Sequence, residues 1–200
     1  MEKIIKSDRI KGILCIIASA CGFAIMSAFI KLAGDLPSFQ KTFFRNLVAA
    51  VIALYLIIKH KGSLVGKKEN RKILILRSTF GTIGIICNYY AVDRLVLSDA
   101  NMLNKLSPFL VVIFCALFLK EKINLKQITM VSVAFIGALF IIKPSFNVEV
   151  LPYLVGVLGA IGAALAYTCV RALGNKEDYY TIVFFFSAFS LIVILPICVV

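Results

Sequence analysis

Long apolar segments alternate with short polar ones along the whole chain. Each apolar segment is about as long as the roughly 20-residue helix that crosses the hydrocarbon core of a bilayer. There are seven such segments: Gly12–Leu32, Gln40–Ile58, Ile73–Val92, Val96–Leu119, Gln127–Ile142, Leu151–Leu173 and Tyr180–Val200. The pattern predicts an all-α polytopic membrane protein with about seven transmembrane helices.

The composition supports a lipid environment. Hydrophobic residues make up 61% of the chain, and the mean hydropathy is +0.98. A soluble chain of 200 residues could not bury this much apolar surface in a single core. The lipid bilayer is therefore the first partner that the sequence predicts.

The net charge of +12 raises the question of nucleic-acid binding. That function requires the basic residues to gather on one face, whereas here the apolar segments divide them. We expect no nucleic-acid partner.

The distribution of lysine and arginine predicts the orientation in the membrane. Fifteen of these cations lie in the N-terminus (1–11) and in every second connection after it, at residues 59–72, 120–126 and 171–176. Four lie in the other connections: Lys31, Lys41, Arg94 and Lys143. Because cytoplasmic loops carry the excess of basic residues, we expect a multi-pass protein of the plasma (inner) membrane with its N-terminus in the cytoplasm. A signal peptide is a weaker interpretation of the basic start, because the apolar run continues to Leu32.

Catalytic and metal-binding patterns are missing from the sequence. The six cysteines all lie within the apolar segments, and none forms a CxxC pair, so neither a disulfide framework nor a metal site is implied. We find no HExxH, GxSxG or phosphate-loop motif. These observations argue against an enzyme.

The first and sixth apolar segments resemble each other weakly. When Gly12 is aligned with Gly156, Gly12-Ile13-Leu14 matches Gly156-Val157-Leu158, and Ala18-Ser19-Ala20 matches Gly162-Ala163-Ala164. Five spans separate the two starting points, and because five is odd, the second copy enters the membrane from the opposite side. Many secondary transporters are built from such inverted repeats, with a substrate site near the midplane.

Several short motifs occur in order between Arg77 and Pro144. They are Arg77-Ser78-Thr79-Phe80-Gly81, Tyr90-Ala91, Leu97-Ser98-Asp99-Ala100, Leu106-Ser107-Pro108, Leu119-Lys120-Glu121-Lys122, and Gly137 with Ile141-Ile142. In this the chain resembles the EamA-type transporters of the drug/metabolite transporter superfamily. The resemblance implies a permease of two inverted five-helix halves that moves metabolites, amino acids or toxic compounds without a cofactor.

The resemblance also implies a domain organisation. Residues 12–143 correspond to a full five-helix repeat, and residues 144–200 to two helices of a second, incomplete repeat. Three helices expected from the family are missing, and the sequence ends in apolar residues. We therefore expect a truncated chain, or one completed by a second chain or by homo-oligomer formation.

The fourth apolar segment contains the strongest candidate for substrate binding. Four of its residues share one helical face by their spacing: Ser98, Asn101, Lys105 and Pro108. Asn104 borders this face, and Pro108 frees its backbone carbonyl from the helix ladder. Lys105 lies near the midplane, where an unpartnered cation is costly, so it is a functional candidate. The alternative is that Lys105 reaches the interface or pairs with Asp99, the only carboxylate that we expect within the membrane.

Other polar residues within the segments add to this site. Arg45, with Asn46 beside it, is predicted to line the pathway, and Tyr167 is predicted to contribute from the second repeat. For Arg77, nearer the cytoplasmic end, phospholipid contact is the more ordinary role. If two of the three cations Arg45, Arg77 and Lys105 face inward, the preferred substrate is anionic.

The sequence thus predicts a permease that moves a small polar metabolite or drug-like compound across the plasma membrane by alternating access. The alternative is an inactive fragment, or a partner subunit of a membrane assembly without its own transport pathway.

Overall fold

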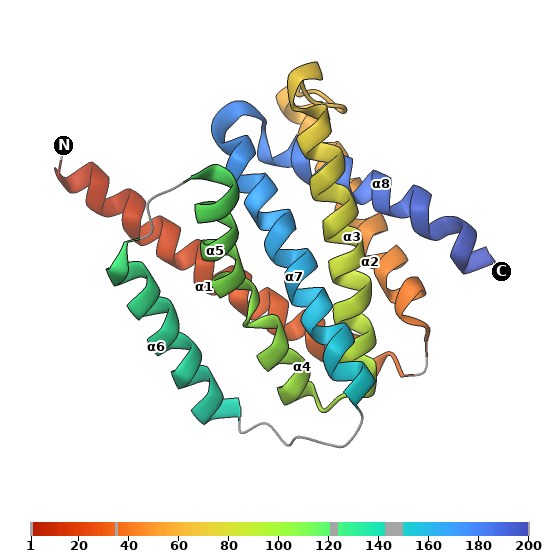
Figure 1. Cartoon of the computed structure of the whole chain (residues 1–200). Helices are drawn as coiled ribbons and strands as arrows, with labels where there is room; N and C mark the ends of the chain where they lie inside the picture. The colour runs from red at the N-terminus through yellow and green to blue at the C-terminus, as the bar shows by residue number, and fades with distance from the viewer. Residues whose placement is uncertain (1, 35, 121–123, 143–149, 200) are drawn as a thin grey trace. The chain divides into compact units, whose positions relative to one another are not determined.

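The computed structural model describes residues 2–34, 36–120, 124–142 and 150–199 (Figure 1). Its helices are α1 (Glu2–Leu32), α2 (Ser38–His60), α3 (Arg71–Arg94), α4 (Leu97–Asn104), α5 (Ser107–Leu119), α6 (Leu125–Ile142), α7 (Val150–Leu173) and α8 (Tyr179–Val199). Two short 3-10 turns, η1 (Lys68–Asn70) and η2 (Gly174–Lys176), precede α3 and follow α7. The described residues contain no strand.

Six helical stretches in the described residues are long and apolar enough to cross a membrane, and a shorter apolar helix covers Leu125–Gly137. The predicted fold class is confirmed: this is an all-α membrane protein with about seven transmembrane helices. The predicted repeat boundary at residues 143 and 144 lies outside the described residues.

The chain divides into two compact units, Met1–Asp35 and Leu36–Val200. The first unit consists of the single helix α1. The second contains α2 to α8, and all polar contacts discussed below lie within it.

Helices α3 and α7 lie side by side and antiparallel in the second unit (Figure 1). A Cβ atom added to Gly84 of α3 would lie 2.8 Å from the backbone nitrogen of Ala163 in α7. One added to Gly159 would lie 3.0 Å from the backbone nitrogen of Asn88, so residue numbers rise along one helix as they fall along the other. Glycine at these positions lets the two backbones approach closely, as small residues do between membrane helices.

The other helices pack around this pair. Helix α2 packs mainly against α8, and α7 also contacts α4 and α5. The contacts among α2, α3 and α8 bring buried polar side chains of these helices into one region.

The fourth predicted span is broken rather than continuous. Helix α4 ends at Asn104 and α5 begins at Ser107, because Pro108 has no N–H to donate to the carbonyl of Asn104. The Ser107 hydroxyl donates to that carbonyl instead, at 2.8 Å, and the Leu106 N–H donates to the Leu103 carbonyl in a tighter turn. The freed carbonyl that the sequence predicted is thus satisfied locally.

Candidate functional site

A buried polar contact joins α2 to α8. The side chains of Asn46 and Ser190 are fully buried, and the Asn46 amide nitrogen donates to the Ser190 hydroxyl at 2.7 Å. Arg45 Nη1 donates to the Asn46 amide oxygen at 3.0 Å. The neighbouring asparagine therefore orients the guanidinium of Arg45 while it holds α8 in place.

Arg77 of α3 lies against α8 in the same region. Its guanidinium carbon lies 3.9 Å from the centroid of the Phe186 ring, a cation–π contact. A Cβ atom added to Gly81 would lie 2.8 Å from Arg77 Nη1 and 2.9 Å from Phe186 Cε2. Because Gly81 lies one turn after Arg77 in α3, the Arg77 side chain extends toward the C-terminal end of α3. The glycine provides the space for this path.

The polar atoms of this region are incompletely paired. In the part of the chain that the structure describes, Arg77 Nε and Nη1 are buried without a hydrogen-bond partner, as are the hydroxyls of Thr82 and Ser187. An unsatisfied buried polar group costs about 1–3 kcal/mol, and more if it is charged. Arg45 and Tyr167 lie within electrostatic range of Arg77, so a second cation adds to the positive potential.

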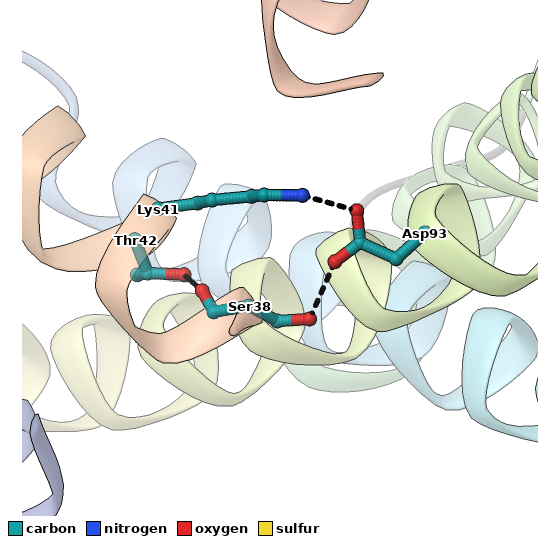
Figure 2. Close-up of polar contacts among 4 residues, drawn as sticks. All are labelled: Ser38, Lys41, Thr42 and Asp93. Atoms are coloured by element: carbon teal, nitrogen blue, oxygen red, sulfur yellow. Dashed lines mark hydrogen bonds and ion pairs between the residues drawn. The ribbon is translucent and has the colours of Figure 1, made fainter. Parts of the chain in front are cut away.

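An ion pair joins the first turn of α2 to the last turn of α3 (Figure 2). Lys41 Nζ lies 2.6 Å from Asp93 Oδ1, and the Ser38 hydroxyl donates to Asp93 Oδ2 at 2.9 Å. The Thr42 hydroxyl donates to the Ser38 carbonyl at 2.7 Å. The Lys41 side chain is only 4% exposed, so the pair is largely shielded from solvent.

Asp99 at the start of α4 is fully buried and contacts α7. The Tyr153 hydroxyl donates to Asp99 Oδ2 at 2.5 Å, and the Ser98 hydroxyl donates to Asp99 Oδ1 at 3.2 Å. This contact joins the segment predicted as the first repeat to the segment predicted as the second.

A further contact between these two segments lies at the opposite end of the helices. Glu177, between α7 and α8, accepts hydrogen bonds from the Lys67 N–H at 2.8 Å and from the Asn70 amide at 2.7 Å. The Thr181 hydroxyl donates to the Ser63 carbonyl at 2.8 Å. The connection between α2 and α3 is thereby fixed to the connection between α7 and α8.

The structure places the six predicted site residues in two groups. Arg45 is half-buried near Arg77, and Tyr167 is exposed but within electrostatic range of that same guanidinium. The other four lie at α4 or just after it, a helix that packs against α7, α3 and α6: Ser98, Asn101, Asn104 and Lys105. Of these, Ser98 and Asn101 are half-buried, whereas Asn104 and Lys105 are exposed at the break before α5.

Three residues have contacts that were not expected from the sequence: Arg77, Lys41 and Asp93. Arg77 was expected near phospholipid, and Lys41 was expected in a loop. A lysine at the start of one helix and an aspartate at the end of the next is a pattern that an antiparallel helix pair brings together, and it could have indicated the Lys41–Asp93 pair.

Comparison with known proteins identifies the family of this chain. Residues 10–143, which include α2 to α6, match the model of the EamA-like transporter family. The chain belongs to this family. The resemblance read from the motifs, to EamA-type transporters of the drug/metabolite transporter superfamily, is confirmed.

Similar proteins carry transport names. The chain is 32% identical over 188 residues to the pseudopaline exporter CntI of Pseudomonas aeruginosa. This alignment covers 93% of this chain and 66% of the exporter. It is 28% identical over 193 residues to solute carrier family 35 member G1 of Mus musculus. This alignment covers 90% of this chain and 52% of that protein. An uncharacterized transporter of Helicobacter pylori is 27% identical over 177 residues, 87% of this chain and 59% of that protein.

The chain thus spans about half to two thirds of the length of these relatives. No solved structure matches it. The family match ends before α7 and α8, so the polar contacts of α2 and α3 with α8 join the matched part of this EamA-like transporter chain to the segment that follows it.

Proposed function

We propose that this chain acts as a permease that moves a small polar solute, a metabolite or a drug-like compound, across the plasma membrane by alternating access. Membership of a transporter family supports the general activity. The observation that carries the proposal is the polar cluster of Arg45, Asn46, Arg77 and Ser190 between mainly apolar helices. Asn46 and Ser190 are fully buried, and Arg77 Nε and Nη1 are buried without a hydrogen-bond partner among the described residues. Polar groups inside a membrane bundle mark a substrate or ion pathway more often than a structural need.

The two contacts between the predicted repeats support alternating access. Glu177 with Asn70 closes one end of the helices, and Asp99 with Tyr153 lies at the other end. Both contacts are hydrogen bonds of carboxylates, which can break and reform while the close α3–α7 packing is kept. A transporter that opens one end at a time needs this combination of a fixed packing surface and separable ends.

The proposed orientation has a cytoplasmic N-terminus. The end closed by Glu177 carries the basic residues of 59–72 and 171–176, whereas the end with the Lys41–Asp93 pair carries few. A Leu64→Cys variant tests this orientation, since Leu64 is exposed in the connection between α2 and α3. In intact cells it should resist a membrane-impermeant maleimide and react after permeabilisation; labelling from outside would reverse the proposed orientation.

The substrate proposal rests on side-chain chemistry. Arg45, Lys105 and Tyr167, with the hydroxyl and amides of Ser98, Asn101 and Asn104, remain predicted contacts for a polar substrate. The name of the Pseudomonas relative makes export the direction to test first.

Comparison of culture media by mass spectrometry tests the proposal. Cells that express the chain should change the extracellular amount of at least one small polar compound relative to cells with an empty vector. The matched control is Lys72→Gln, at an exposed lysine of the first turn of α3, which should behave as the parent chain. Equal media from all three cultures would contradict the proposed activity.

A further inference from the structure

The Arg77 guanidinium lies largely within the bundle, and no described residue provides it with an anionic partner. Three carboxylates of this unit are engaged elsewhere: Asp93 with Lys41, Asp99 with Tyr153, and Glu177 with Asn70. Among the described residues, neither Arg77 nor Arg45 forms an ion pair. Arg77 lies against Phe186, and Arg45 is bonded through Asn46 to Ser190, so both guanidinium groups are held beside the same stretch of α8 with no counter-charge among the described residues.

The surroundings of Arg77 keep it in this position instead of letting it reach the membrane interface. Gly81 leaves room for the guanidinium, and the Phe186 ring covers one face at 3.9 Å. The ring contributes a cation–π attraction but cannot accept in-plane hydrogen bonds from Nε and Nη1. Both buried donors therefore lack an acceptor, and carboxylate and phosphate oxygens are the acceptors that a guanidinium binds most strongly.

Arg45 is held beside this position by a second set of contacts. Asn46 orients it, and Ser190, which fixes Asn46, lies one turn after Phe186 on the same face of α8. Phe186, which covers Arg77, and Ser190, which holds Arg45 through Asn46, therefore belong to one stretch of α8. A shift of that stretch would expose both guanidinium groups together.

We propose that Arg77 and Arg45 form a binding site for a carboxylate or phosphate group between α2, α3 and α8, with Phe186 covering it in the unliganded state. This inference rests on the proposed function in one respect: when the anionic group belongs to a soluble solute, the site selects the transported substrate. Arg77 supplies buried donors without an acceptor, and Arg45 supplies a second positive charge. Lys105, exposed at the break before α5, is not part of this site.

Thermal unfolding of the purified full chain tests the site without any transport measurement. The chain is held in an uncharged detergent or in phosphatidylcholine nanodiscs, and a maleimide dye reports the exposure of the buried Cys115 and Cys169. Inorganic phosphate or succinate replaces chloride stepwise at constant ionic strength. Each should raise the unfolding temperature until the effect reaches a plateau. A polyamine titration serves as the cationic control and should not raise it.

Variants show whether the effect belongs to this site. In Arg77→Gln the apparent dissociation constant should rise about tenfold or more, because charged hydrogen bonds are lost. Arg77→Lys keeps the charge but loses the planar set of guanidinium donors, so its apparent dissociation constant should lie between those of the parent chain and Arg77→Gln. This variant guards against a folding defect in Arg77→Gln. Arg71→Gln, at an exposed arginine of the same helix, should titrate as the parent chain.

A lipid headgroup is the other source of the same chemistry. Nanodiscs that contain phosphatidylglycerol, followed by native mass spectrometry, show whether an anionic lipid is retained by the parent chain and lost from Arg77→Gln. Arg77-dependent lipid retention without a phosphate or succinate effect would assign the site to lipid, and the reverse would assign it to a soluble anion.

The proposal is overturned if phosphate, succinate and phosphatidylglycerol all act equally on the parent chain, Arg77→Gln and Arg71→Gln. Flux of a neutral solute by a chain that shows no anion effect would leave the permease function standing and remove only this site. An anion effect in a chain without flux would support the anion site and contradict the permease function.

Discussion

The close approach of α3 and α7 makes Gly84 the most informative position for a stability test. In Gly84→Ala the new Cβ atom would meet three backbone atoms of α7: the Ala163 nitrogen at 2.8 Å, the Gly162 carbonyl carbon at 3.1 Å and the Gly159 oxygen at 3.2 Å. Backbone atoms cannot turn away as a flexible side chain can. The helices must therefore separate by roughly half an ångström to one ångström to restore ordinary contact.

Two effects of this substitution oppose each other. Alanine favours a helix over glycine by about 1 kcal/mol at most. Overpacking of a tight contact costs about 1–3 kcal/mol, and here the strain spreads along an interface that includes Gly159 and Asn88. We expect a net loss of about 1–2 kcal/mol of stability.

The matched control is Gly137→Ala in α6, where an added Cβ atom has nothing within 4 Å. Only the helix preference acts there, so its unfolding temperature should stay equal or rise slightly. Both variants are compared in one detergent by dye-detected thermal unfolding and by mild SDS titration. If Gly84→Ala were as stable as Gly137→Ala, the backbone contact between α3 and α7 would not exist as described.

Three further changes test other contacts. Lys41→Met and Asp93→Asn, measured singly and together, should show a coupling of about 1–3 kcal/mol in a double-mutant cycle, and additivity would mean that the shielded ion pair does not form. Pro108→Ala restores an N–H to the ladder, so it should raise the unfolding temperature and lower transport, whereas unchanged transport would remove the break from the mechanism. Lys105→Gln should reduce transport of a substrate found in the medium comparison, with exposed Lys72→Gln as control; equal rates for the two would dismiss Lys105 as a contact.

The transmembrane helices could be predicted from the sequence for a simple reason. In lipid each span must satisfy its own backbone hydrogen bonds and present apolar side chains over about 20 residues, so the signal is local. The role of Pro108 was also local, since the freed Asn104 carbonyl follows from one missing N–H. The local sequence did not reveal that the Ser107 hydroxyl would take that carbonyl and end the helix at Asn104.

The side-chain partners depend on how distant segments meet. Arg77 extends along α3 because Gly81 is small and because Phe186 lies across from it, and nothing near Arg77 in the sequence specifies that phenylalanine. The pairing of Lys41 with Asp93 requires the register between α2 and α3. An ionisable residue within a span can thus be recognised from the sequence, whereas its partner requires the fold.

Flux through the purified chain in sealed liposomes is the most direct test of the central claim that this protein carries polar solutes across the bilayer. Vesicles are loaded with the compounds identified in the medium comparison, and their efflux is followed for the parent chain, Arg45→Gln and Lys72→Gln. The parent chain and Lys72→Gln should release at least one compound faster than protein-free vesicles, and Arg45→Gln should release it more slowly. Efflux no faster than from protein-free vesicles would contradict the account and favour a subunit that needs a partner.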